Sequence, residues 1–377
     1  MIALASAILL FIGTYSDPSD SPPGGIYSLC FDTDKGIFSQ PELAAATAKP
    51  TFLALHPNGR LLYATTDLSG FAGGADKAPN VFFTIPGSGK LRPTESGITG
   101  GLPLVHAGVD PTGRSLCVAS YRGWIESFPL KADGTPEKPA SLIENKGPIG
   151  PQHNRQDRSH PHSVTLSPDG RRLYVCDLGL DRIYCYLLDP KTSLLTPADP
   201  SFTMTRPGMG PRHSKFSDDG RFLYVIGELD GTIATYACDS RSGSLSFLQR
   251  IPTLPADYSG PNTCAEIRIH PSGRFVYGSN RGHDSIAVFA RNPSTGLLTL
   301  VEIVPCGGAH PRNFAISPNG DWLICANRDS NNLVAFRVDQ QTGRLSQCGK
   351  SAQIPKPTCV LIMPPAWPAK PDVSTPL

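Results

Sequence analysis

Short apolar segments separated by glycine-containing turns recur along the whole chain. One pattern is an apolar segment, a turn such as HPNG or SPDG, and a second apolar segment; it occurs six times, with turn glycines 47 to 57 residues apart. In these turns Pro presets the backbone angle and Gly accepts a positive φ, so the pattern predicts hairpins. The turn glycines are Gly59, Gly113, Gly170, Gly220, Gly273 and Gly320.

A second pattern alternates with the first. It consists of an acidic residue or Asn, a turn that contains Gly, and an apolar segment with Ser or Thr, as in NPSTGLLT (292–299). Seven copies occur, and Ser193 stands in place of the glycine in the copy at 189–196. Together the patterns predict units of four antiparallel strands, here called a to d, with the first turn between a and b and the second between c and d.

The two ends of the chain complete each other. Residues 357–364 match strand a but have no strand b after them, whereas the segment LLFIGTYS near the N-terminus matches a strand b that lacks its a. This predicts an all-β fold, a seven-bladed β-propeller over residues 1–364, whose last blade joins N-terminal strands to the C-terminal strand. Such closure removes exposed sheet edges. An open β-solenoid or two β-domains are the alternatives, and residues 365–377 are predicted to form a Pro-rich tail.

Composition narrows the functional classes. The 34 Lys and Arg against 32 Asp and Glu give a net charge of +2, which lacks the basic footprint of a nucleic-acid binder. No apolar run approaches the ~20 residues of a membrane span, so we expect neither nucleic acid nor membrane as a partner.

The cysteines and the N-terminus bear on location. Ten cysteines without a CxxC pair favour small buried side chains in a reducing compartment, and hence a cytoplasmic protein. The apolar start MIALASAILL lacks the basic region of a signal peptide, although Ala5-Ser6-Ala7 resembles a cleavage site, so a truncated export signal is the alternative.

Reactive side chains gather at one predicted rim. In an antiparallel blade the start of strand a and the end of strand b lie at the same edge, and strand a lines the central channel. The polar residues at the a-starts are His106, His160, His162, Arg212, His213, Glu266, His310 and Arg312, and those at the b-ends are Asp67, Arg122, Asp177, Glu228, Asn280, Arg281, Asn327 and Arg328. The alternative for any single residue is a capping role, and His56 and His270, each before Pro, are interpreted as turn residues. The long polar segment 144–159 is predicted to be a binding loop or lid.

These motifs resemble those of the seven-bladed propeller lactonases, a family that includes propeller-type 6-phosphogluconolactonases and the 3-carboxy-cis,cis-muconate lactonizing enzymes. The resemblance spans roughly residues 9–364, and no GH…WD pair marks the repeats as WD40. The stretches that carry it are FIGTYSD (11–17), NRQDRSHPHSVTLSPDG (154–170), GPRHSKFSDDGRFLYVIGE (210–228), HPSGRFVYGSNRGHDSIAVF (270–289), AHPRNFAISPNG (309–320) and CANRDSNNLVAF (325–336).

The resemblance implies a lactonase that hydrolyses 6-phosphogluconolactone to 6-phosphogluconate in the pentose phosphate pathway. It places the catalytic group on His160 or His162, Arg212, Glu228 and Arg281. Neighbouring rim residues, His213, Asn280, His310, Arg312 and Asn327, are the expected substrate-binding residues. We expect no cofactor, and a monomer or weak homodimer.

The chemistry leaves the roles open. Because no GxSxG motif occurs, water is the expected nucleophile, activated by the His160/His162 pair or, second, by Glu228. The two arginines suit a 6-phosphate, or one of them suits the oxyanion. We expect no metal, although the spacing of His160 and His162 would allow zinc. Two other functions remain: a muconate-type lactonizing enzyme, and a non-catalytic propeller that serves as a protein-binding platform.

Overall fold

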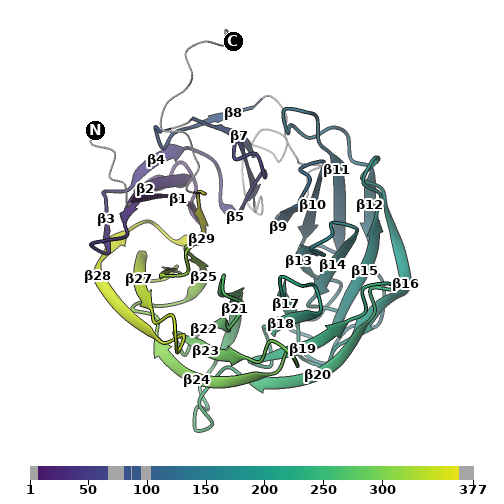
Figure 1. The fold of residues 1–377 in the computed structure, drawn as a ribbon. Coiled ribbons are helices and arrows are strands. Elements are labelled where there is room, and N and C mark those ends of the chain that lie inside the picture. Colours follow the sequence, from purple (N-terminus) through teal and green to yellow (C-terminus); the bar gives the residue numbers. More distant parts are fainter. Residues whose placement is uncertain (1–6, 67–79, 86, 95–102, 365–377) are drawn as a thin grey trace.

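Seven antiparallel sheets are arranged in a ring around a central axis (Figure 1). The computed structural model describes residues 7–66, 80–85, 87–94 and 103–364, so the predicted rim residue Asp67 and the tail 365–377 lie outside the described residues. None of the described residues belongs to a helix long and apolar enough to cross a membrane. The predicted all-β propeller with seven blades is confirmed.

The strands follow the predicted a-to-d order in each blade. The innermost strands are β5 (Pro50–Leu55), β9 (Leu104–Val109), β13 (Pro161–Leu166), β17 (Pro211–Phe216), β21 (Thr263–Ile269), β25 (Pro311–Ile316) and β29 (Pro357–Ile362). The second strands are β6 (Leu61–Thr66), β10 (Ser115–Ser120), β14 (Arg172–Asp177), β18 (Phe222–Gly227), β22 (Phe275–Arg281), β26 (Trp322–Asn327) and β1 (Ala7–Thr14). The third are β7 (Val81–Thr84), β11 (Trp124–Pro129), β15 (Arg182–Leu188), β19 (Thr232–Cys238), β23 (Ser285–Arg291), β27 (Asn332–Val338) and β2 (Ile26–Asp32). The outer strands are β8 (Leu91–Pro93), β12 (Ser141–Glu144), β16 (Leu195–Met204), β20 (Leu245–Pro252), β24 (Leu298–Pro305) and β28 (Leu345–Gln353), and in the last blade β3 (Ile37–Phe38) and β4 (Glu42–Ala45).

The last blade joins the two ends of the chain, as the sequence predicts. Strand β29 pairs antiparallel with β1, so that Leu10 lies opposite Ile362 and Ile12 opposite Val360. Leu10 and Ile12 are fully buried and Val360 nearly so. Burial in a blade therefore explains the apolar character of the segment that starts at Ala7.

Neighbouring blades are linked by a repeated hydrogen bond. A buried tyrosine on the second strand of one blade donates its hydroxyl to the backbone oxygen of the turn glycine between the third and outer strands of the next blade. The pairs are Tyr63 with Gly134 (2.6 Å), Tyr174 with Gly243 (2.8 Å), Tyr224 with Gly296 (2.8 Å) and Tyr277 with Gly343 (2.9 Å). Each bond satisfies a buried hydroxyl, so the apolar contacts between blades are not weakened by an unpaired polar group.

The Pro-Gly turns lie at the face opposite the predicted rim. There His56 Nε2 contacts the backbone oxygen of Gly113 at 3.0 Å, and His270 Nε2 contacts that of Gly320 at 2.9 Å. Each histidine thus ties its turn to that of the next blade, in keeping with their interpretation as turn residues. All ten cysteines are free and seven are buried, as expected for small core side chains.

Candidate active site

The strand register brings the predicted rim residues together. Pro211 at the start of β17 pairs with Gly227 at the end of β18, and Thr263 at the start of β21 pairs with Arg281 at the end of β22. Arg212 and Glu228 are therefore neighbours on one blade, and Arg281 faces them from the next. The predicted convergence at the rim is what the backbone produces.

Glu228 is the centre of this cluster. Its Oε2 accepts a hydrogen bond from Arg212 Nε at 2.8 Å and lies 3.0 Å from Arg281 Nη2, and its Oε1 accepts from Arg155 Nη2. The carboxylate is 2% exposed. Burial by itself raises the pKa of Glu228, but Arg281 and Arg212 outweigh burial and hold that pKa well below its usual range. Glu228 is therefore a permanent anion whose oxygens are already occupied.

The two buried arginines are fixed by backbone oxygens as well. Arg212 Nη1 donates to the carbonyl of Ala265 at 2.7 Å, and Arg281 Nη2 donates to that of Cys264 at 2.7 Å. Burial, with repulsion from Arg281, lowers the pKa of Arg212 to about 9. Arg212 therefore remains charged at neutral pH, and the positions of both guanidiniums are set before any substrate arrives.

His160 is held by acceptors on both sides of its ring. Its Nδ1 lies 2.6 Å from the carbonyl oxygen of Tyr121 and its Nε2 lies 2.7 Å from Asp157 Oδ1, while the ring stacks on Tyr121 at 4.2 Å between centroids. Both partners accept, so both ring nitrogens must donate for the two bonds to form. The backbone N–H of His160 donates to Asp177 Oδ1 at 2.8 Å. These contacts assign His160 to holding the loop and leave it no free nitrogen.

His162 has a different environment. Its Nε2 lies 3.9 Å from Glu228 Oε2, and its Nδ1 has no hydrogen-bond partner among the described residues. Burial, followed by the charge of Arg212, lowers the pKa of His162 well below its usual value. The ring is thus neutral at pH 7 and keeps a nitrogen that can take a proton.

A layer of rings lies across the channel below this cluster. Phe52 packs on His106 at 4.0 Å between centroids, His106 meets His213 at 5.1 Å, and His213 meets His162 at 5.4 Å. His213 Nε2 lies 3.1 Å from Arg212 Nη1, which can only donate, so this nitrogen accepts; its Nδ1 faces Glu266 Oε2 at 3.3 Å. His213, a predicted substrate-binding residue, thus bonds to Arg212 through Nε2, while its Nδ1 makes no hydrogen bond with the described residues.

Arg312 extends the positive charge of the rim. Its guanidinium lies over the ring of Tyr15, 5.8 Å from the centroid, and it makes no ion pair with the described residues. Burial, followed by repulsion from Arg281 and Arg328, lowers its pKa to about 10, so it stays charged at pH 7. Among the predicted substrate-binding residues, Arg312 is the one with a free charge.

Beside Arg312, the carboxylate of Asp329 contacts both His310 and Arg328. His310 Nδ1 lies 3.2 Å from Asp329 Oδ2, and Arg328 Nε donates to Asp329 Oδ1 at 2.7 Å. Burial, then the charges of Arg281 and Arg328, lowers the pKa of His310 to about 3. His310 is therefore a neutral side chain at the rim.

Asn280 and Asn327 lie at the strand ends where they were predicted, but their amides bond to the segment that follows the outer strand of the preceding blade. Asn280 Nδ2 donates to the backbone oxygen of Thr253 at 2.9 Å and its Oδ1 accepts from the Thr253 hydroxyl at 2.7 Å. Asn327 Nδ2 donates to the backbone oxygen of Cys306 at 3.0 Å. Both side chains are fully buried, so the structure gives them a capping role rather than a place beside Glu228.

Arg155 is the rim residue that the sequence reasoning missed. It belongs to the segment 144–159, which the sequence marks only as a long polar loop, and its side chain reaches Glu228 Oε1 while remaining 36% exposed. A basic residue within a long loop at the predicted rim was the available signal. Among the described residues, no group of three or more His, Cys, Asp and Glu side chains is placed to hold a metal ion.

Comparisons with known proteins identify the family of the chain. A family model described as "Lactonase, 7-bladed beta-propeller" matches residues 9–362. A 6-phosphogluconolactonase of Bacillus subtilis (strain 168) is 34% identical over 352 residues, 93% of this chain and 97% of the relative, and one of Formosa agariphila is 34% identical over 350 residues, 90% and 94%. The solved structure of a Pseudomonas aeruginosa periplasmic gluconolactonase has a TM-score of 0.85 at 31% identity and covers 96% of this chain and 100% of that one. The chain therefore belongs to the family of seven-bladed β-propeller lactonases.

Proposed function

We propose that the protein hydrolyses 6-phosphogluconolactone to 6-phosphogluconate, with water attacking the lactone carbonyl at the Glu228 rim. The observation that carries this proposal is the charge balance there. Three arginines, at positions 155, 212 and 281, share the single carboxylate of Glu228, and this local excess of positive charge favours an anionic substrate. The lactonase family and the two relatives named 6-phosphogluconolactonase support the same substrate.

His162 is the proposed general base. It is neutral at pH 7 and has an unpartnered ring nitrogen, whereas Glu228 is held as an anion by three guanidiniums and His160 has no free nitrogen. When His162 takes a proton from water, the negative charge of Glu228 3.9 Å away stabilises the resulting cation. Glu228 then acts as a counter-charge rather than as the base.

The arginines take separate tasks in this proposal. Arg212 and Arg281 are fixed by Glu228 and by backbone oxygens, which suits them to stabilise the oxyanion of the tetrahedral intermediate. Arg312 has no carboxylate partner among the described residues and its planar fork matches a phosphate, so it is assigned to the 6-phosphate.

The test compares two substrates. Hydrolysis of freshly prepared δ-6-phosphogluconolactone and of δ-gluconolactone is followed above the spontaneous rate for the wild type, Arg312→Met and the control Arg60→Met, whose side chain is exposed at the far turn face. We expect Arg312→Met to raise KM for the phosphorylated lactone by about tenfold or more, as for a lost charge-assisted bond, and to change KM for δ-gluconolactone little.

Three outcomes would contradict the proposal. No catalysed hydrolysis of either lactone would remove the lactonase function. Equal effects of Arg312→Met on both substrates would remove the phosphate assignment. Turnover of a carboxylated muconate, detected by its ultraviolet absorbance, without lactone hydrolysis would favour the lactonizing reaction.

We also propose a cytoplasmic location and a monomer or weak homodimer. Ten free cysteines suit a reducing compartment, and the closed ring of blades leaves no need for a partner to complete a sheet. Cell fractionation and analytical ultracentrifugation test these points; an extracytoplasmic protein or a tight oligomer would refute them.

A further inference from the structure

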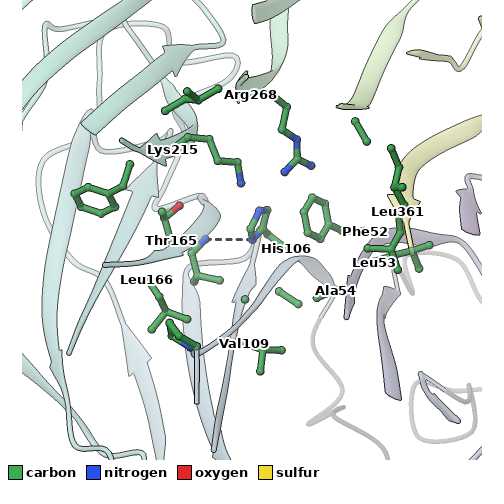
Figure 2. A pocket seen from close by; sticks show the side chains of 18 of the residues that line it. Phe52, Leu53, Ala54, His106, Val109, Thr165, Leu166, Lys215, Arg268 and Leu361 are labelled. Atoms are coloured by element: carbon green, nitrogen blue, oxygen red, sulfur yellow. Dashed lines mark hydrogen bonds between the residues drawn. The ribbon is translucent and has the colours of Figure 1, made fainter. Parts of the chain in front are cut away.

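A cavity opens at the mouth of the channel opposite the Glu228 cluster, on the face of the Pro-Gly turns (Figure 2). It has a volume of about 580 Å³ and is lined by the C-terminal halves of the innermost strands and by turn residues such as Pro111 and Pro168. This size is typical of sites for small ligands. The layer of Phe52, His106, His162 and His213 separates it from the Glu228 cluster, so it is a distinct site.

Two cationic side chains extend into this cavity. Lys215 comes from β17 and Arg268 from the adjacent innermost strand β21, and both are seen among the lining residues in Figure 2. No carboxylate is among the described residues that line the cavity. Two like charges in one cavity without an anion in it repel each other, and an anionic ligand would relieve that repulsion.

The nearest carboxylate neutralises one of these charges. Glu266 is fully buried behind the lining; its Oε2 lies 3.5 Å from Arg268 Nη2 and also accepts from Asn313 Nδ2. Lys215 makes no hydrogen bond or ion pair with the described part of the chain. Burial, followed by repulsion from Arg268, lowers the pKa of Lys215 to about 8, so the amine is still mostly charged at pH 7. The cavity thus holds one uncompensated positive charge.

The rest of the lining is mainly apolar. Val109, Leu166, Ile316 and Leu361 contribute aliphatic surface. The described residues of the lining carry two hydroxyls, and both are already engaged. Thr165 donates to the backbone oxygen of Ser214 at 3.2 Å and accepts from the Ser214 hydroxyl at 2.9 Å, and Ser167 donates to Asp169 Oδ1 at 2.5 Å. A fitting ligand therefore has one anionic end and an apolar body.

We propose that this cavity binds a small organic acid, with its carboxylate between Lys215 and Arg268 and its apolar body against the aliphatic wall. The site does not depend on the proposed lactone chemistry, because it uses none of the residues around Glu228.

The probe is benzoate, measured by isothermal titration calorimetry against the wild type, Lys215→Met and the control Lys350→Met, which removes an exposed lysine. Benzyl alcohol tests the need for the charge, and inorganic phosphate tests the need for the apolar body. We expect benzoate to bind the wild type and Lys350→Met equally and Lys215→Met at least tenfold more weakly, with benzyl alcohol and phosphate both binding more weakly than benzoate to the wild type.

A second measurement locates the ligand without relying on the variant. Reductive methylation with ¹³C keeps the lysine charge, and the Lys215 signal, assigned by its absence in Lys215→Met, is expected to shift on titration with benzoate. Unchanged benzoate affinity in Lys215→Met, or a Lys215 signal that does not move, would overturn the site. Equal binding of benzyl alcohol would overturn the role of the charge, and equal binding of phosphate would overturn that of the apolar wall.

Discussion

Replacing Glu228 by Gln removes the negative charge that Arg212 and Arg281 share. Gln keeps the shape of the side chain, but it leaves two buried guanidiniums that are 2% and 8% exposed without their counter-ion. Removing one partner from a buried ion pair typically costs about 3–5 kcal/mol, and we expect the free energy of unfolding of Glu228→Gln to fall by that amount at pH 7. Urea unfolding followed by tryptophan fluorescence measures it. The control is Glu144→Gln, whose exposed pair with Lys146 is worth about 1 kcal/mol or less.

Two further measurements separate a charge effect from a loss of packing. In the double variant Arg212→Met/Glu228→Gln one of the stranded cations is gone, so the loss of stability is expected to be smaller than the sum of the single losses by about 1–3 kcal/mol.

The pH dependence gives the second separation. Because the pKa of Glu228 is lower in the folded than in the unfolded protein, its stabilisation is fully present above the unfolded value of about 4.3 and is lost as the pH falls through the folded value. The stability difference between wild type and Glu228→Gln should therefore shrink toward the acid end. A loss in the free energy of unfolding of Glu228→Gln below about 1 kcal/mol would refute the reasoning. So would a loss in the double variant equal to the sum of the two single losses.

Three other predictions follow from the contacts. Arg155→Met should lower kcat/KM for the lactone about tenfold, as expected for the loss of one charge-assisted bond. Its free energy of unfolding should fall by less than ~1 kcal/mol, because the Arg155 side chain is over a third exposed. Arg158→Met on the same loop is the control, and equal kinetics of the two variants would contradict this prediction. The profile of kcat/KM against pH, corrected for spontaneous hydrolysis, should show no inflection near 6.5, because the lowered pKa of His162 keeps the ring neutral there; an inflection at that pH that is lost in His162→Gln would contradict the lowered pKa. Val360→Asp places an unpaired charge in β29, where the ring closes, and should cost about 4 kcal/mol or more in thermal or urea unfolding, whereas Leu248→Asp, 40% exposed, should cost little; similar stabilities would refute the closure argument.

The fold was predictable because its signals are local and repeated. A Pro-Gly turn specifies its hairpin wherever it occurs, and the missing partner strands at the two ends have one simple solution in a ring. The rim was predictable for the same reason, since antiparallel register alone places Arg212, Glu228 and Arg281 at one edge.

The roles of the individual rim residues were not predictable from the sequence. Asn280 and Glu228 both lie at the end of a second strand. Asn280 bonds to Thr253, which follows the outer strand of the preceding blade, whereas Glu228 contacts three arginines. His160 and His162 stand two residues apart, and only the carbonyl of Tyr121 and the carboxylate of Asp157 distinguish them. These partners come from other strands and loops, so their hydrogen bonds are not encoded in the motif that contains each residue.

The serine at turn position 193, where the other copies have glycine, is explained by a contact between two blades. A side chain at the turn position Gly296 would meet the ring of Phe222 on the preceding blade at 2.3 Å. The corresponding pairs are Gly134 with Leu61, Gly243 with Arg172, Gly343 with Phe275 and Gly36 with Trp322. Where the preceding blade instead has the small Ser115, the turn residue is Ser193, which keeps the left-handed backbone at φ 60° and has its hydroxyl 2.7 Å from that of Ser115.

The same blade lacks the tyrosine that bonds the turn at four other contacts between blades. Cys117 occupies the tyrosine position and cannot reach the turn, and the hydroxyl of Ser127 donates to the backbone oxygen of Ser193 at 2.6 Å instead. A left-handed Ser costs about 1–2 kcal/mol relative to Gly, and a hydrogen bond contributes about 0.5–1.5 kcal/mol, so the two serine contacts offset the strain. Two departures from the repeat, 78 residues apart, are thus one physical adjustment at the contact between two blades.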